Sequence, residues 1–118
     1  MPATRHVLMI VPDLFFAMKI RTAAAHLGVE VVATEPARLV ADCRARVPVR
    51  VIVDLHAAAG ALDAIRELKA DPALVGVPVT GFYSHVDDAA RRAALAAGVD
   101  QAMPRSAFTA KLTELLAH

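Results

Sequence analysis

Short runs of apolar residues, many of them β-branched, alternate along this chain with segments in which apolar residues recur every three or four positions. The continuous runs predict buried strands, and the three-to-four spacing predicts amphipathic helices. The runs occupy residues 6–11, 29–33, 50–53, 78–83 and 100–103. The helical patterns occupy residues 15–27, a segment opening at Thr34 or Glu35, and residues 60–70, 86–97 and 106–117. The chain therefore consists of five strand–helix units.

The predicted strands are apolar on both faces. Such strands need helices on both sides of the sheet, and parallel pairing follows from the helical connections between them. Right-handed crossovers then give an open, doubly wound sheet, whose common five-stranded order is 2-1-3-4-5. We therefore expect a flavodoxin-like (βα)5 fold that takes in residues 1–118 as one α/β domain.

One carboxylate stands where a buried strand ends. Asp54 closes the run Val51-Ile52-Val53, and small residues follow it. In doubly wound sheets the ligand crevice lies at the carboxyl ends of the strands, where the winding direction reverses. The segments after the other central strands should converge there. They are Val11-Pro12-Asp13, Tyr83-Ser84-His85 and Pro104-Arg105-Ser106.

Composition and charge exclude several classes of protein. Thirteen basic and twelve acidic residues give a net charge of +1, and their scatter is not the footprint of a nucleic-acid-binding protein. The single cysteine, Cys43, cannot form an internal disulfide, and its helical spacing predicts core packing. No apolar run reaches the length of a membrane span, and residues 1–6 lack a signal-peptide pattern. We therefore expect a cytoplasmic protein that binds neither nucleic acid nor membrane.

Together these features resemble the receiver domains of bacterial two-component response regulators, the CheY-like domains. The resemblance covers essentially the whole chain, and it rests on the (βα)5 plan, Asp54 after strand three, Ile65-Arg66, Val77-Pro78-Val79 and Gly98-Val99-Asp100. The resemblance implies that Asp54 accepts a phosphoryl group. It also implies that Mg²⁺ is held by Asp54 and by an acidic pair after strand one. It further implies a Ser or Thr after strand four and a Lys after strand five.

The positions that would carry this chemistry depart from the family pattern. Val11 and Pro12 stand at the positions of the acidic pair, and Tyr83, with Ser84 beside it, stands at the position of the Ser or Thr. Arg105 stands at the position of the Lys, and Ser106 replaces the proline that normally follows that Lys. Mg²⁺ takes oxygen ligands, and the first two of these residues offer no side-chain oxygen. We therefore expect a degenerate receiver, a pseudo-receiver, with slow or absent phosphotransfer, no cofactor and no enzymatic activity. Asp13, next to the acidic-pair positions, is an alternative metal ligand beside Asp54, and it also fits an N-cap of the first helix.

An arginine at the lysine position changes what Asp54 can bind. A guanidinium is forked and permanently charged, so it can hold a carboxylate through two hydrogen bonds, whereas an ammonium is a point charge. Our hypothesis is that Arg105 pairs with Asp54, directly or through water, and fixes one conformation without phosphate. In the alternative, Asp54 accepts hydrogen bonds from loop N–H groups and Arg105 lies in solvent.

Other chemistries receive less support. His56 and His85 follow strands three and four, and with Asp13 they suggest a transition-metal site, although these residues lack metal-ligand spacing. Ser84 and His85 are neighbours on extended backbone and point to opposite sides, so they do not predict a nucleophile with its base. The turn at residues 11–14 lacks the glycines of a phosphate-binding loop.

Two surfaces are candidates for a partner. In receivers the face from strand four to helix five is the usual surface for dimers and partners, and here it includes Arg91 and Arg105. Phe15 and Phe16 are adjacent on a helix and cannot both face the same core, so Phe15 is a candidate anchor for a partner or packs against the loop after strand three. Because no segment follows the last helix, we expect output through such a surface and not through an attached DNA-binding domain.

Three functions remain open. The leading hypothesis is a stand-alone pseudo-receiver that acts in phosphorelay signalling as a protein-interaction module, with a histidine kinase, another signalling protein or a second copy as partner, the last as a homodimer. The alternative is a working phosphoacceptor that uses Asp54, Asp13 and Arg105 in shifted geometry with Mg²⁺ and receives its phosphoryl group from a histidine kinase. The third is a small-molecule-binding module that uses the same crevice.

Overall fold

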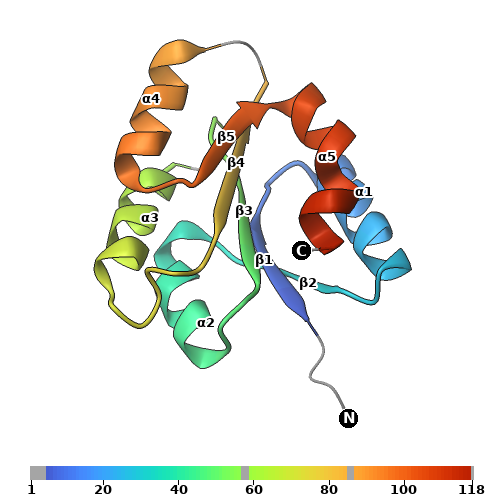
Figure 1. Cartoon of the computed structure of the whole chain (residues 1–118), viewed down its shortest axis with the longest axis horizontal. Helices are drawn as coiled ribbons and strands as arrows, with labels where there is room; N and C mark the ends of the chain where they lie inside the picture. Colours follow the sequence, from blue (N-terminus) through green and yellow to red (C-terminus); the bar gives the residue numbers. More distant parts are fainter. Residues whose placement is uncertain (1–4, 57–58, 85–86, 118) are drawn as a thin grey trace.

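The computed structural model describes residues 5–56, 59–84 and 87–117, which contain one five-stranded sheet (Figure 1). Each pair of neighbouring strands is parallel, and the order is β2-β1-β3-β4-β5. The strands are β1 (His6–Ile10), β2 (Glu30–Ala33), β3 (Arg50–Asp54), β4 (Val79–Tyr83) and β5 (Gln101–Pro104). The expected order 2-1-3-4-5 is confirmed.

Helices cover both faces of this sheet. They are α1 (Leu14–His26), α2 (Leu39–Ala45), α3 (Ala61–Ala70), α4 (Asp88–Ala97) and α5 (Arg105–Ala117), with a 3-10 turn, η1 (Pro36–Arg38), before α2. In Figure 1, α1 and α5 lie on one side of the sheet, and α2, α3 and α4 lie on the other. The predicted doubly wound, flavodoxin-like architecture is confirmed.

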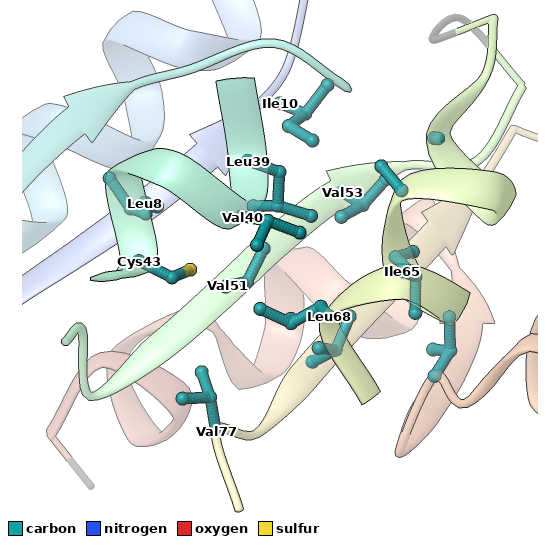
Figure 2. Close-up of a cluster of buried hydrophobic side chains, with 14 of the residues drawn as sticks. Leu8, Ile10, Leu39, Val40, Cys43, Val51, Val53, Ile65, Leu68 and Val77 are labelled. Atoms are coloured by element: carbon teal, nitrogen blue, oxygen red, sulfur yellow. The ribbon is translucent and has the colours of Figure 1, made fainter. Parts of the chain in front are cut away.

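The continuous apolar strands contribute side chains to two separate cores, one on each face of the sheet. In β1, Val7 and Met9 belong to the core under α1 and α5, whereas Leu8 and Ile10 belong to the core under α2, α3 and α4. Successive side chains of a strand point to opposite faces, so a strand buried on both sides has no polar alternation. Figure 2 shows the second core, in which side chains from α2 and α3 pack against β3.

Cys43 lies in the second core and is fully buried (Figure 2). Desolvation, with the nearby charge of Asp42 as a smaller cause, raises the pKa of its thiol to about 11. The thiolate is the reactive form of cysteine, so this side chain is an apolar packing group and not a nucleophile.

The helical segment after β2 begins with the 3-10 turn η1 and continues as α2. Thr34, one of the two residues expected to open it, donates its backbone N–H to the Met9 carbonyl at 2.9 Å, which is a bond to β1 just after the end of β2. Its hydroxyl donates to Asp42 Oδ2 at 2.5 Å, and Glu35 makes no side-chain cap. Of the two expected starts, Thr34 is therefore wrong and Glu35 is confirmed, because Glu35 is the N-cap of η1, Pro36 lies in the first turn, and α2 follows directly at Leu39.

The ends of α4 follow from local chemistry. Asp87 has extended backbone, and its side chain accepts a hydrogen bond from the Ala90 N–H, so Asp87 is the N-cap and the helix begins at Asp88. Val86 itself lies outside the described residues. Gly98 ends the helix with φ of 112°, a left-handed conformation that favours glycine.

Candidate functional site

Asp54 is the last residue of β3 and is 2% exposed. It is paired in register with Phe82 of β4, so its side chain points to the face that α1 and α5 cover. Its Oδ1 accepts a hydrogen bond from the backbone N–H of His56 at 3.1 Å. A buried carboxylate needs such donors and a compensating positive charge, because burial removes the water that would otherwise stabilise it.

That charge comes from Arg105, the first residue of α5. Its Nη2 lies 3.6 Å from Asp54 Oδ2, and its Nη1 lies 3.5 Å from Asp13 Oδ2. Both distances suit ion pairs and exceed that of a good hydrogen bond. One guanidinium therefore stands between a buried carboxylate of β3 and a half-exposed carboxylate at the start of α1.

Aromatic rings support the same guanidinium. The Arg105 Cζ lies 4.5 Å from the ring centroid of Phe16 and 5.5 Å from that of Phe82. These two rings form a cluster with Phe108, with centroid separations of 4.8 to 5.8 Å. The planar cation of arginine stacks on such rings, which lysine does less well. The Arg105 Nε is buried, and within the described part of the chain it has no hydrogen-bond partner.

Asp13 has a second role that the sequence predicts and the structure confirms. It is the N-cap of α1, and its side chain accepts hydrogen bonds from the backbone N–H groups of Phe15 at 3.0 Å and Phe16 at 3.2 Å. The hydrogen bond from Phe16 is the largest cause that lowers the pKa of Asp13, and the Phe15 N–H and Arg105 add to it against partial desolvation. The cap therefore stays ionised next to the guanidinium.

The donor set does not fit Mg²⁺. At the two positions before Asp13, the half-buried Val11 and the exposed Pro12 carry no side-chain oxygen. The remaining carboxylates, Asp13 and Asp54, have their Oδ2 atoms turned to the guanidinium of Arg105. Mg²⁺ requires a near-octahedral shell of oxygens, and a divalent cation here would also be repelled by the adjacent positive charge.

A second small cluster lies beside the first. Tyr83, the last residue of β4, is 4% exposed, and its ring centroid lies 6.2 Å from that of His56. The Nε2 of His56 lies 3.4 Å from Oδ2 of Asp87, the N-cap of α4. The N–H of Ala90 is the largest cause that lowers the pKa of Asp87, and His56 contributes less. Asp87 is not among the site residues expected from the sequence, although its place before an alanine-rich helix is an N-cap signal.

The other expected site residues lie farther out. Ser84 and Ser106 are exposed, as are Arg91 on α4 and Phe15 on α1. Tyr83 occupies the Ser or Thr position of the resemblance, and strand alternation turns it to the face opposite Phe82 and Asp54. His85 falls outside the described residues. The structure thus brings Asp13, Asp54 and Arg105 together and leaves the two serines at the surface.

Two further findings concern the described residues as a set. Within residues 5–56, 59–84 and 87–117, no group of three or more His, Cys, Asp or Glu side chains is arranged to hold a metal ion. In the same part of the chain, none of the helices has both the length and the apolar character needed to span a bilayer.

Known proteins resemble this chain in structure and not in sequence. No family model matches it, and neither does any curated protein sequence. It is similar to the phosphorylated cyanobacterial phytochrome response regulator RcpA, with a TM-score of 0.77 at 20% identity over 98% of this chain and 90% of that one. A response regulator from Thermotoga maritima gives 0.78 at 16% identity over 97% and 95%, and one from Hahella chejuensis gives 0.80 at 15% over 96% and 92%. The order of the sheet, the helices on both faces and these likenesses agree, and the chain has the fold of the response-regulator receiver domains.

Proposed function

We propose that this chain is a receiver-like signalling protein, a pseudo-receiver, in which Arg105 takes the place of the divalent cation and phosphorylation of Asp54 plays no part. The observation that carries this proposal is the position of the Arg105 guanidinium between Asp54 and Asp13. The carboxylate that would accept phosphate already has a cation, which is part of the chain and cannot dissociate.

Charge explains why this arrangement opposes phosphorylation. A phosphoryl group in transfer spreads negative charge over three oxygens, and catalysis of the transfer depends on cations placed around them. Here the incoming group would meet the negative charges of Asp54 and Asp13 with one monovalent guanidinium to balance them. The aromatic support of Arg105 further limits how far the guanidinium can move to follow those oxygens.

Such a protein would act by contact and not by catalysis. The fold is shared with signalling proteins, and the ion pairs join β3, α1 and α5 in one arrangement. A fixed arrangement can present one surface to a partner at all times, whereas a receiver that is phosphorylated and dephosphorylated changes between two conformations. The proposed partner is therefore a signalling protein that binds this chain in its unmodified state.

The second candidate function is a working phosphoacceptor. Asp54 stands at the carboxyl end of the central strand, one similar structure is a phosphorylated response regulator, and another is the Mn²⁺-bound form of response regulator Rcp1. In this reaction a carboxylate oxygen of Asp54 would form the new P–O bond while the bond from phosphorus to the donor breaks. Arg105 would have to leave Asp54 for a metal to enter.

Incubation with acetyl phosphate and Mg²⁺, followed by mass spectrometry of the intact protein, separates the two functions. We expect no adduct on the wild-type chain under conditions that phosphorylate an active receiver run as a positive control. In a matched variant with Val11→Asp, Pro12→Asp and Arg105→Lys, the oxygen ligands and the ammonium are restored, so an adduct should become detectable. A stoichiometric adduct on the wild-type chain that disappears in Asp54→Asn would overturn the proposal in favour of the phosphoacceptor.

A further inference from the structure

A trough lies between helix α2 and the strands β1 and β2. Its volume is about 320 Å³, which is near the lower end of the range of small-molecule sites. Its floor includes Leu8, which belongs to the core under α2, α3 and α4, whereas Asp54 points to the opposite face of the sheet. The trough is therefore separate from the site around Asp54.

The floor of the trough is polar at one end and apolar beyond it. The strand register places His6 beside Glu30 and Leu8 beside Val32, and residues two apart on a strand share a face. His6 is 4% exposed, and its Nε2 donates a hydrogen bond to the Arg46 carbonyl oxygen at 2.9 Å. The guanidinium of Arg46 lies 3.3 Å from Oε1 of Glu30. Polar contacts between the two strands and the end of α2 therefore close this end of the trough.

The wall of the trough carries another ion pair toward its other end. Residues four apart on a helix lie on one side of it, and Arg38, Asp42 and Arg46 have this spacing. The Oδ2 of Asp42 accepts a hydrogen bond from the Thr34 hydroxyl at 2.5 Å, which fixes the carboxylate next to the end of β2. Its Oδ1 lies 3.5 Å from Nη2 of Arg38, whose side chain is 68% exposed. The carboxylate is thus held in place, whereas the guanidinium can turn toward a ligand.

The charges of the lining balance. Among the described residues that line the trough, two guanidiniums and two carboxylates are present. An inorganic ion of either sign would meet as many like charges as opposite ones. A zwitterion avoids this repulsion, because each of its two charges can face a group of opposite sign. The apolar row of Leu8 and Val32 adds a surface for a hydrocarbon group.

We propose that this trough binds a free aliphatic α-amino acid of about the size of leucine. The ligand carboxylate accepts hydrogen bonds from the Arg38 guanidinium, and the ligand ammonium donates to Oδ1 of Asp42. The ligand therefore inserts into an ion pair that is loose and exposed, and opening such a pair opposes binding only slightly. The ligand side chain lies on Leu8 and Val32, and the polar contacts at the far end limit its length.

An extended peptide is the main alternative occupant. In the described sheet β2 is an edge strand, so its outer backbone groups can pair with a further strand. A residue within a peptide has neither an α-ammonium nor an α-carboxylate, so it would leave Arg38 and Asp42 without their ligands. The charged groups of the trough therefore favour the free amino acid.

NMR titration of the isotope-labelled full chain with L-leucine tests the proposal. We expect saturable shifts of backbone amides around the trough, including Val32 and Asp42, with a Kd of about 1 mM or tighter. Isocaproate lacks the ammonium of leucine, and isoamylamine lacks its carboxylate, so each should bind about tenfold or more weakly. N-acetyl-leucine amide, which lacks both charges and stands for a peptide residue, should also bind about tenfold or more weakly.

Substitutions locate the site. Arg38→Gln removes an exposed guanidinium and should weaken L-leucine binding by about tenfold or more while the chain stays folded. Asp42→Asn should weaken it similarly, because the ligand ammonium loses its counter-charge. Arg44→Gln is the matched control on the same helix, since Arg44 pairs with Asp71 and does not line the trough. This variant should leave the affinity unchanged.

Three results would overturn the proposal. They are the absence of saturable shifts at about 10 mM L-leucine, an affinity insensitive to Arg38→Gln and Asp42→Asn, and binding of N-acetyl-leucine amide as tight as that of L-leucine. The last result would assign the trough to an extended segment of a partner. The proposal goes beyond the proposed function and does not depend on it, because the trough and Asp54 lie on opposite faces of the sheet. An acetyl phosphate adduct on Asp54 would leave the amino-acid site standing.

Discussion

At the scale of single residues, Arg105 combines an electrostatic contact with an apolar one. Its charge compensates Asp54, which is buried at the end of β3, and its flat face rests against Phe16. A lysine could supply the charge but would not reproduce the stacking or the forked geometry. An arginine at position 105 therefore fits this particular pocket better than a lysine would.

Substitution of Arg105 should show how much the stability of the fold depends on the ion pair between Arg105 and Asp54. We expect Arg105→Ala to lower the free energy of unfolding by about 2 kcal/mol, because a buried carboxylate loses its counter-ion. In the Asp54→Asn background the same substitution should cost less, with a coupling of at least about 0.5 kcal/mol in a double-mutant cycle. Urea unfolding measures all four proteins, and Arg91→Ala, an exposed arginine of α4, serves as the control with little change. Strictly additive effects would show that the ion pair does not couple the two residues.

At the scale of elements, α1 illustrates how one helix divides its residues between core and surface. Phe15 is 89% exposed and Phe16 is 7% exposed, although they are adjacent in the chain. The rotation of about 100° between neighbours on a helix turns one ring to solvent and the other into the cluster around Arg105. The matched pair therefore offers a direct comparison of a surface and a core phenylalanine.

Truncation of these two residues should have very different effects on stability. We expect Phe16→Ala to lower the free energy of unfolding by about 3–4 kcal/mol through the cavity it leaves. Phe15→Ala should change it by less than about 0.5 kcal/mol, because its side chain makes little contact with the core. Chemical denaturation of the two variants measures the difference. A large loss on Phe15→Ala would mean that the ring packs on the protein in solution.

The C-terminal end of α4 provides a second element-scale prediction. Gly98 has φ of 112°, and a Cβ added to it would lie 2.7 Å from Cγ of Lys69. We expect Gly98→Ala to reduce the free energy of unfolding by about 1–2 kcal/mol, through left-handed backbone strain and displacement of the Lys69 side chain. Gly76→Ala is the matched control, because nothing lies within 4 Å of its Cβ position and its φ is not positive. The thermal midpoints of both variants measure the contrast, and equal shifts would contradict it.

At the scale of the whole molecule, three carboxylates in different places respond to pH in the same direction. Backbone N–H groups are the largest cause that lowers the pKa of Asp13, Asp71 and Asp87 from their ordinary value of 3.8. A carboxylate whose pKa is lower in the folded state stabilises the fold at pH values well above its ordinary pKa. That contribution is lost as the pH falls through the ordinary value toward the lowered one.

We therefore expect the urea midpoint of unfolding to be insensitive to these groups near neutral pH and to fall steadily below about pH 5. Asp87→Asn keeps a good helix cap but cannot titrate, so it should reduce the slope of this fall. Denaturation curves recorded from pH 7 to pH 3 measure the effect. A slope that Asp87→Asn leaves unchanged would show that the cap of α4 does not contribute.

Much of the whole fold is already present in the local pattern of the chain. The five apolar runs and the helices between them predicted the sheet, its order and the covering of both faces, because strands buried on both sides and joined by helices leave few other arrangements. The place of Asp54 at the carboxyl end of β3 also followed from the run that it closes. The choice between Thr34 and Glu35 as the start of the next helical segment did not, because it depends on the hydrogen bond from the Thr34 N–H to the Met9 carbonyl at the end of the sheet, which leaves Glu35 as the N-cap.

The sequence by itself determined the architecture and the candidate site, since strand and helix periodicity and the placement of strand ends are local properties. Only the tertiary structure decided that Arg105 lies between Asp54 and Asp13, that Phe16 and Phe82 support it, and that Asp87 meets His56. These contacts join segments far apart in the chain, and their distances depend on how helices and loops pack at the carboxyl edge of the sheet. Periodicity places a residue on an element, and packing decides which side chains meet.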